Sequence, residues 1–311
     1  MRDWRVTLGS LTLNNPVLAA AGTFGYGIEF ARAVRLDRLG AMITKTLTRH
    51  PREGNPPPRL VETPAGMLNA VGLQNVGLEA FLAEKLPALA AFQVPVIVSV
   101  LGESLPDVEA MCGRLETHAG VAAIELNLSC PNIRETRNTQ HETPRMVAQD
   151  ADATFTIVQA ARRQTRKPLI AKLSPDVTDL APIAQAAVRA GATALSLVNT
   201  FMGMSLDPTT RRSRVGMLTG GVSGPAIRPL AVYRVWYTAQ SVSVPIIGLG
   251  GIVRAEDALE FFLAGAAAVA VGTANFANPR APLHVLRGLE RYADRHRIGS
   301  LEELRGAINR P

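Results

Sequence analysis

Short apolar runs that alternate with longer segments constrain the fold of this chain more than any other feature. Each run is rich in Val, Ile, Leu and Ala, which is typical of a buried parallel strand, and each intervening segment has the amphipathic or alanine-rich pattern of a covering helix. We predict strands at residues 17–20, 41–45, 96–100, 123–126, 169–173, 194–198, 246–249 and 268–271. We predict helices at residues 78–92, 106–117, 144–163, 180–190, 227–239, 255–264 and 282–295.

Eight strands that alternate with helical segments in about 300 residues predict an α/β fold of the closed (β/α)8 TIM-barrel type. An open doubly wound sheet is less consistent with the sequence, because no GxGxxG motif follows the first predicted strand. The chain has 311 residues, 47% of them hydrophobic, which suits one large core. No linker divides it, so we expect residues 1–311 to form a single domain. Ser300-Leu-Glu-Glu303 predicts a capping box before a last short helix.

Two connections are too long to be simple turns. Residues 50–77 follow the second predicted strand, and residues 200–225 follow the sixth. Long insertions in a compact barrel are usually functional, and loops after strand ends form the active face of a barrel. We therefore expect both insertions to contribute to a site.

Charge and hydropathy argue against several functional classes. The net charge is +7, but the basic residues are scattered and no aromatic platform lies among them, so nucleic-acid binding is not predicted. No uncharged apolar stretch approaches the roughly 18 residues of a membrane span. The first residues lack the apolar region of a signal peptide. We expect a cytoplasmic protein with no membrane association.

A thiol is placed where the fourth predicted strand ends. Cys130 follows the strand in the segment Glu125-Leu-Asn-Leu-Ser-Cys-Pro-Asn132, and Pro131 biases it away from helical angles. A thiol among polar groups on the active face is a candidate base or nucleophile, and a buried structural thiol is the alternative. The second cysteine, Cys112, lies in a helical pattern and is expected to serve packing. The pair forms neither a disulfide framework nor a CxxC motif.

Lysines and glycines mark further candidate positions. Lys45 and Lys172 end strand-like runs, where each needs an anionic or hydrogen-bonding partner unless it extends to the barrel rim. Gly250-Gly251 and Gly272-Thr273 follow the last two strands, where barrels often bind phosphate through backbone N–H groups. Plain turns are the alternative for these glycines.

Asparagines and histidines complete the set of polar candidates. Asn127 and Asn199 come directly after apolar strands, which favours a site over a loop or cap role. The histidines form no metal-binding spacing, so no metal is predicted. The residues alone therefore indicate a barrel that takes a phosphate-bearing cofactor and a small anionic substrate. A phosphate-binding barrel without redox chemistry (a lyase, an isomerase or a binding protein) is the alternative.

Several motifs taken together, in order from about residue 8 to 282, resemble a dihydroorotate dehydrogenase. Cysteine in the strand-end motif is typical of the soluble class, because the membrane-bound class has serine there and an N-terminal extension. Glu62-Thr-Pro-Ala-Gly-Met-Leu-Asn69 is most similar to the NAD-linked, two-subunit branch. The motifs are Lys45-Thr46, Asn69-Ala-Val-Gly-Leu73, Asn127-Leu-Ser-Cys-Pro-Asn132, Asn199-Thr200, Gly221-Val-Ser-Gly-Pro-Ala226, Gly250-Gly251 and Gly272-Thr273.

The resemblance implies an FMN-dependent oxidation of (S)-dihydroorotate to orotate in de novo pyrimidine (UMP) biosynthesis, with one FMN per chain. Cys130 would remove the C5 proton as general base, and a hydride would pass from C6 to the flavin. The implied substrate-binding residues are Lys45, Asn69, Ala70, Val71, Gly72, Leu73, Asn127, Asn199 and Thr200. The implied cofactor-binding residues are Ala21, Lys45, Thr46, Ser99, Asn127, Lys172, Val198, Gly224, Gly250, Gly251, Gly272 and Thr273.

Two of these positions depart from the family pattern. Ser99 stands where the family commonly has Asn, and Ala21 stands where a small hydroxyl residue is frequent. A hydroxyl at one position and a backbone group at the other can still contact a flavin.

The same resemblance implies a partner. NAD would be the final acceptor through a separate subunit that carries FAD and a [2Fe–2S] cluster, and the chain would form a homodimer within a heterotetramer. A fumarate-linked dihydroorotate dehydrogenase and a related flavin-dependent dihydropyrimidine dehydrogenase remain alternatives.

Overall fold

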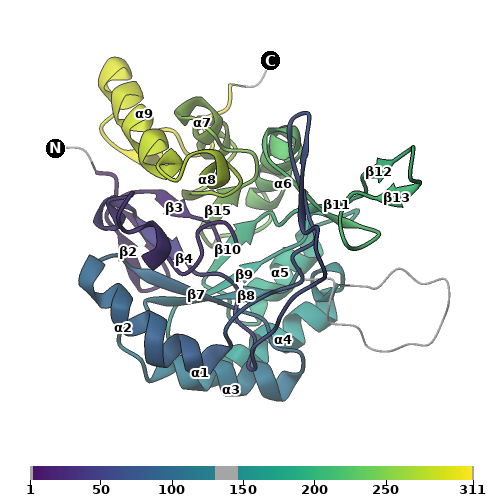
Figure 1. The fold of residues 1–311 in the computed structure, drawn as a ribbon. Coiled ribbons are helices and arrows are strands. Elements are labelled where there is room, and N and C mark those ends of the chain that lie inside the picture. Colours follow the sequence, from purple (N-terminus) through teal and green to yellow (C-terminus); the bar gives the residue numbers. More distant parts are fainter. Residues whose placement is uncertain (1–2, 130–145, 310–311) are drawn as a thin grey trace.

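A closed barrel of eight parallel strands forms the centre of the computed structural model, which describes residues 3–129 and 146–309 (Figure 1). All eight predicted strands are present within two residues of their expected ends, and the TIM-barrel prediction is confirmed. The barrel strands, in order around the barrel, are β3 (Val17–Ala19), β4 (Ala41–Ile43), β7 (Val96–Val100), β8 (Ala123–Asn127), β9 (Leu169–Lys172), β10 (Ala194–Leu197), β15 (Ile246–Leu249) and β16 (Ala268–Val271).

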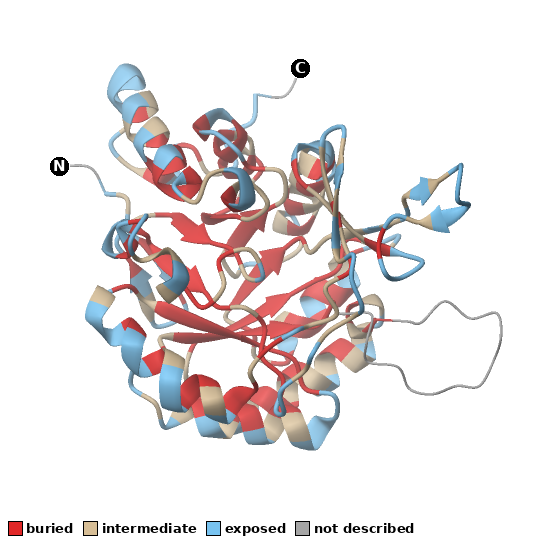
Figure 2. Cartoon of the chain, viewed as in Figure 1, coloured by how far each residue is buried: buried red, intermediate tan, exposed pale blue. Residues whose placement is uncertain are grey.

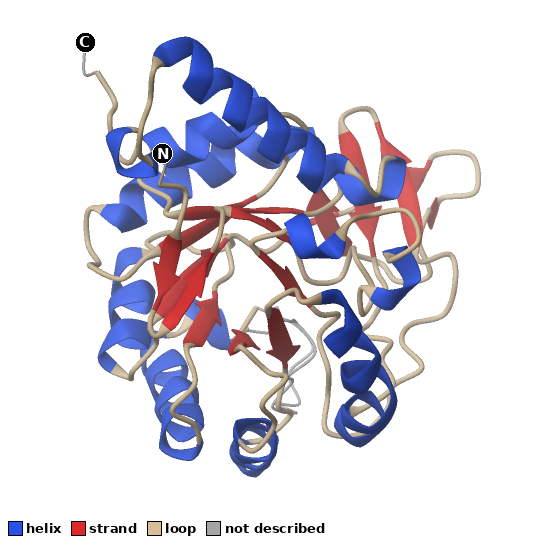
Figure 3. Ribbon diagram, turned by 90° about the vertical axis from the view of Figure 1, so that its left-hand side faces the viewer, coloured by secondary structure: helices blue, strands red, loops and turns tan. Residues whose placement is uncertain are grey.

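Helices lie on the outside of this barrel (Figure 3). The segment predicted as one helix at 78–92 is instead α1 (Leu78–Ala80), a π-helical turn (Phe81–Lys85), α2 (Leu86–Leu89) and a 3-10 turn (Ala90–Phe92). The helix predicted at 144–163 begins later, at Ala151 after a 3-10 turn (Val147–Gln149), and residues 144–145 lie outside the described residues. The other predicted helices form near their expected bounds, and a short α8 precedes the last one. They are α3 (Leu105–Glu116), α4 (Ala151–Gln164), α5 (Ala181–Arg189), α6 (Arg228–Ala239), α7 (Ala255–Leu263), α8 (Ala274–Ala277) and α9 (Ala281–His296).

The first barrel strand, β3, is not followed by an α-helix. Only two 3-10 turns, Ile28–Phe30 and Leu36–Arg38, lie between β3 and β4. The C-terminal helix α9 packs against β3 instead, so the last helix of the chain helps to close the first unit. The capping box predicted at Ser300 is present, but it begins a 3-10 turn (Leu301–Glu303) rather than an α-helix.

Every residue of the eight barrel strands is buried, as Figure 2 shows in red. Burial on both faces explains why the strands read as continuous apolar runs rather than alternating ones. Five polar residues interrupt this apolar interior, namely Ser99, Glu125, Asn127, Lys172 and Ser196. Burying polar groups costs free energy unless partners are found, so their positions are informative.

The two long insertions form one small antiparallel sheet, a feature that the sequence did not predict. Its strands, in the order β11 (Phe201–Gly203), β14 (Gly220–Ser223), β6 (Gly66–Asn69) and β5 (Leu60–Thr63), come from both insertions. A second pair, β12 (Leu206–Asp207) and β13 (Arg212–Ser213), projects beside it, to the right of the barrel in Figure 1. A further unpredicted hairpin is β1 (Val6–Leu8) and β2 (Leu11–Leu13) near the N-terminus.

Within residues 3–129 and 146–309, the helices are all too short or too polar to cross a membrane.

The environment of Cys112 generates a prediction. Cys112 is completely buried in α3, and burial raises the pKa of its thiol to about 12, which fits the packing role expected for it. In a Cys130→Ala variant, Cys112 is the last remaining thiol. We expect this variant to react with a thiol reagent about a thousandfold more slowly in native buffer than in guanidinium, because labelling requires unfolding. Stoichiometric labelling of the folded variant would contradict the packing role.

Candidate active site

The carboxyl ends of the barrel strands bring the predicted site residues to one rim. Each of the eight strands supplies at least one of them, at its end or just beyond. In strand order these residues are Ala21, Lys45 with Thr46, Ser99, Asn127, Lys172, Val198 with Asn199 and Thr200, Gly250 with Gly251, and Gly272 with Thr273. This is the face on which barrel enzymes carry their chemistry.

A chain of side-chain hydrogen bonds connects four strand ends. Asn127 Nδ2 donates to Thr46 Oγ1 at 3.1 Å, and Thr46 Oγ1 lies 3.0 Å from Ser99 Oγ. On its other side, Asn127 Oδ1 accepts from Ser129 Oγ at 3.2 Å, and Asn199 Nδ2 donates to Ser129 Oγ at 2.6 Å. The amides of Asn127 and Asn199 are therefore held by protein partners before any ligand binds.

Two lysines supply positive charge to the rim. Lys172 is only 5% exposed and pairs in register with Asn127 on the neighbouring strand. Lys45 is half-buried; burial lowers its pKa, the nearby Arg59 lowers it further, and Glu29 opposes both effects. In the described part of the chain, neither lysine forms an ion pair with a carboxylate. A largely buried ammonium without such a partner is suited to an anionic or electron-rich ligand.

The loop from Asn69 to Leu73 is held rigidly by two asparagines outside it. Asn55 donates from its backbone to Val71 O at 3.0 Å and from its side chain to Ala70 O at 3.1 Å. Gly72 has φ +74°, and a Cβ there would lie 2.4 Å from the Asn55 side chain, so this close approach requires glycine.

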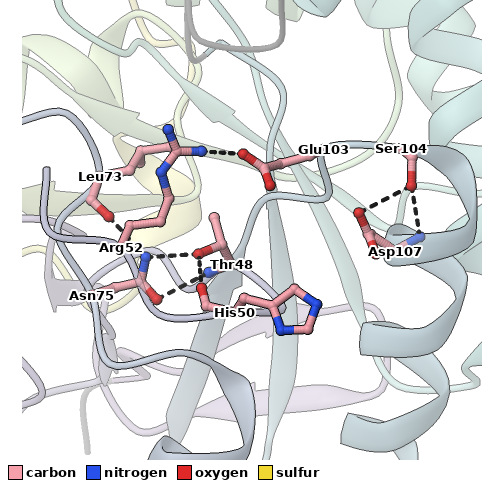
Figure 4. A network of polar contacts seen from close by, with 8 residues as sticks. All are labelled: Thr48, His50, Arg52, Leu73, Asn75, Glu103, Ser104 and Asp107. Atoms are coloured by element: carbon pink, nitrogen blue, oxygen red, sulfur yellow. Dashed lines mark hydrogen bonds and ion pairs between the residues drawn. The ribbon is translucent and has the colours of Figure 1, made fainter.

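Asn75 fastens the end of the same loop (Figure 4). Its Nδ2 donates to Thr48 Oγ1 at 2.9 Å and to Leu73 O at 2.8 Å. Its Oδ1 accepts from the backbone N–H groups of Thr48 at 3.2 Å and Gly77 at 2.8 Å. All four hydrogen-bonding positions of Asn75 are used within the protein, so its role is structural.

The small insertion sheet brings Asn69 next to Thr200. Asn69 pairs with Gly221 across β6 and β14, and Asn69 Nδ2 donates to Gly221 O at 3.0 Å. A Cβ at Gly221 would lie 2.2 Å from Thr200 Oγ1, which shows how closely Thr200 packs there. Thr200 N donates to Asn199 Oδ1 at 2.9 Å, so this second wall joins the strand-end asparagines.

Glycine loops form the opposite side of the rim. A Cβ on Gly251 (φ +75°) would lie 2.8 Å from Gly224 O, so the two loops touch. Val198 N donates to Leu249 O at 3.0 Å, which places Val198 beside Gly250. A Cβ on Gly272 would meet Ala20 at 3.7 Å, next to Ala21. Glycines leave the backbone N–H groups of these loops accessible. On a rim that also carries a buried lysine, such loops fit a phosphate-bearing cofactor such as FMN.

The described contacts do not place every predicted residue in these clusters. Cys130 lies outside the described residues, as does Asn132. No contact in the described part of the chain places Thr273 against the strand-end asparagines. Ser99 belongs to the hydrogen-bond chain through Thr46, but it is completely buried and its hydroxyl is engaged by Thr46 and Glu125. Among the residues described, no group of three His, Cys, Asp or Glu side chains gathers as a metal site would require.

Three residues near the rim received no role from the sequence. Glu125 bonds Ser99, Ser129 bridges Asn127 and Asn199, and Arg59 lies close enough to Lys45 to depress its pKa. A charged residue within an apolar strand was a visible signal for Glu125. Arg59 had none, because a 14-residue separation from Lys45 in an irregular insertion carries no periodicity.

Comparisons with known proteins agree on one family. The chain matches the family model described as dihydroorotate dehydrogenase over residues 4–292. It is 49% identical over 306 residues to a protein of Pelobacter propionicus, covering 98% of both chains. It is 51% identical over 305 residues to one of Desulforudis audaxviator, covering 98% of this chain and 97% of the relative. Both relatives carry the name dihydroorotate dehydrogenase B (NAD(+)), catalytic subunit.

The charge environment of Lys45 generates a prediction. With only four lysines in the chain, reductive methylation with ¹³C-formaldehyde and NMR titration can follow each one separately. We expect Lys45 to titrate below the ordinary lysine range of about 10.4. Arg59→Gln should raise the Lys45 pKa by removing a neighbouring cation, and Glu29→Gln should lower it. An unchanged titration in both variants would contradict the electrostatic account of the rim.

Proposed function

This chain belongs to the dihydroorotate dehydrogenase family, and from that premise we propose that it oxidises (S)-dihydroorotate to orotate with FMN bound on the barrel rim. It is an oxidoreductase most similar to the NAD-linked branch. The main support for the proposal is a set of hydrogen bonds that hold the side chains of Asn69, Asn127 and Asn199 on the rim. Two lysines that lack carboxylate partners in the described part of the chain lie on the same rim. The reaction belongs to de novo pyrimidine (UMP) synthesis.

The chemistry requires a base and a place for negative charge. The C5–H of dihydroorotate is a poor acid, because only the adjacent carbonyl helps its conjugate base. Cys130 serves as the general base; a free thiol titrates near ~8.5, so modest help from its surroundings supplies the thiolate. FMN, when bound, supplies the acceptor for the hydride that leaves C6. Dihydroorotate thus loses one proton and one hydride, which leaves the C5–C6 double bond of orotate.

The remaining residues hold the two reactants. Lys45 and the loop from Asn69 through Ala70, Val71 and Gly72 to Leu73 contact the substrate, together with Asn127, Asn199 and Thr200. Lys172 places a cation against the flavin ring, where it favours the negative charge of the reduced form. The residues proposed to hold FMN are Ala21, Lys45, Thr46, Ser99, Asn127, Lys172, Val198, Gly224, Gly250, Gly251, Gly272 and Thr273.

The electron acceptor involves a second protein. The relatives are named as NAD(+)-linked catalytic subunits, which implies a partner subunit for them. With two cysteines in the whole sequence, this chain cannot supply the four thiolates of an all-cysteine [2Fe–2S] cluster. We therefore assign FAD and a [2Fe–2S] cluster to a separate subunit, and propose a heterotetramer built on a homodimer of this chain. One FMN-binding domain, residues 1–311, is proposed for the chain itself.

Anaerobic spectroscopy tests the substrate and the acceptor. We expect the purified protein to carry one FMN per chain and dihydroorotate to bleach its absorbance without oxygen. Adding NAD to the isolated chain should leave the flavin reduced, whereas adding the partner subunit with NAD should restore the colour. Colourless protein would favour a non-redox phosphate-binding barrel, and reoxidation by fumarate alone would favour the fumarate-linked type.

Substitution of Cys130 tests the base. Cys130→Ala should keep its flavin but lose about 10²- to 10⁴-fold in the rate of flavin reduction, since a positioned base contributes that much. Cys130→Ser should be slow but active near neutral pH, because a hydroxyl is far harder to ionise. Cys112→Ala is the matched control and should reduce at the normal rate. Unchanged single-turnover kinetics in Cys130→Ala would refute the assignment.

A further inference from the structure

Glu125 is a buried carboxylate that the proposed reaction leaves without a role. It lies in β8 with none of its surface exposed. Ser99 Oγ donates to Glu125 Oε1 at 3.0 Å, while Oε2 has no hydrogen-bond partner among the described residues. A carboxylate in an apolar barrel destabilises the fold unless its interactions compensate. An apolar residue would fill this position with a lower desolvation free energy. The hydrogen bond that Glu125 accepts is therefore the feature that indicates a role for it.

The hydrogen bonds from the rim to Glu125 all run in one direction. The Ser99 hydroxyl donates its single hydrogen to Glu125 Oε1, so it has none left to donate to Thr46. The 3.0 Å contact between Thr46 and Ser99 must then use the Thr46 hydrogen. Thr46 Oγ1 is left to accept from Asn127 Nδ2. Each hydroxyl donates once toward Glu125 and accepts once from the rim side.

This direction decides which amide atom of Asn127 faces Thr46. Asn and Gln amides are nearly symmetrical in shape, so only their hydrogen-bond partners distinguish the two orientations. Thr46 has given its hydrogen to Ser99, so it can only receive, and the nitrogen of Asn127 must face it. Asn127 Oδ1 then accepts from Ser129 Oγ at 3.2 Å and from Asn199 Nδ2 at 3.5 Å.

One hydrogen-bonding position stays unused on the amide of Asn127 and one on the amide of Asn199. Asn127 keeps one unassigned N–H donor, because only one of its two amide hydrogens is used, in the bond to Thr46, while its oxygen accepts from Ser129 and Asn199. Asn199 keeps one unassigned lone pair, because its nitrogen donates to Ser129 and Asn127 while its oxygen accepts once, from Thr200 N. A donor beside an acceptor matches the carbonyl and N–H that alternate around a dihydropyrimidine ring.

We propose that Glu125 is a positioning residue, the terminal acceptor of a one-way hydrogen-bond chain through Ser99 and Thr46 that fixes the amide of Asn127 with its N–H toward the ligand. The inference rests on the proposed function, because it takes the ligand to be the pyrimidine ring. Without the acceptor, the Thr46 hydrogen is released and can donate to Asn127. Both amide orientations then become accessible, and the wrong one places an oxygen against a ring oxygen.

Serine substitutions test the chain while keeping Glu125 in place. In the flavin-loaded protein, the dissociation constant of orotate is measured from the change it causes in the flavin spectrum. In the flavin-loaded fraction of each variant, Ser99→Ala should weaken orotate binding about tenfold, and Ser99→Thr should restore it. Ser196→Ala is the matched control: this completely buried barrel hydroxyl has no partner among the described residues, so its loss should not change the affinity.

The acidic residue itself is tested by a pair of variants. Glu125→Gln keeps an oxygen that can accept from Ser99, so it should bind orotate within about threefold of the wild type. Glu125→Ala removes the acceptor and should resemble Ser99→Ala if it folds. Equal orotate affinities for Ser99→Ala and Ser196→Ala would overturn the proposal, and so would a Glu125→Gln protein as weak as Ser99→Ala.

The inference and the function on which it rests fail in different ways. If dihydroorotate does not bleach the wild-type flavin, the proposed function fails. If the wild type bleaches normally and Ser99→Ala binds orotate as tightly as it does, only the role of Glu125 fails.

Discussion

Closure of the eight-stranded parallel barrel is the constraint on which the rest of this structure depends. Parallel strands that close on themselves place all their carboxyl ends on one rim. Residues as distant in the sequence as Thr46, Asn127 and Asn199 therefore become hydrogen-bonded neighbours. The closed sheet also keeps water from its interior, which strengthens each polar contact made there. The two long insertions add a second wall because they pair with each other in a separate sheet.

A line of polar groups in an otherwise apolar barrel gives the rim its chemical character. Lys172 contributes a cation from one strand, and Glu125 contributes a carboxylate from the next. Neither is placed to neutralise the other through a direct ion pair in the described part of the chain. The lysine is thus available to a ligand, while the carboxylate acts through Ser99 and Thr46. Under the proposed function, the separation of these two charges lets one rim hold an anionic cofactor and also orient neutral amides.

The barrel could be predicted from the sequence because each of its strands is buried on both faces and is therefore continuously apolar. The insertion sheet could not, since its strands are short, half-exposed and rich in glycine, as in Gly220-Gly221. No helix was predicted after the first barrel strand, and none is present there, but the packing of α9 against β3 from the far end of the chain could not be predicted. Strand-end residues such as Asn127 and Lys172 were predictable from position. Arg59 was not, because only tertiary folding brings it to Lys45.

The most direct test of the central claim is a crystal structure of the purified protein grown with orotate. The account predicts a flavin on the barrel rim, with its phosphate at the loops of Gly250, Gly251 and Gly272 and its ring beside Lys172. Orotate should lie in contact with Asn127 and Asn199, against the loop that begins at Asn69. A rim without flavin, or orotate bound elsewhere on the molecule, would contradict the account.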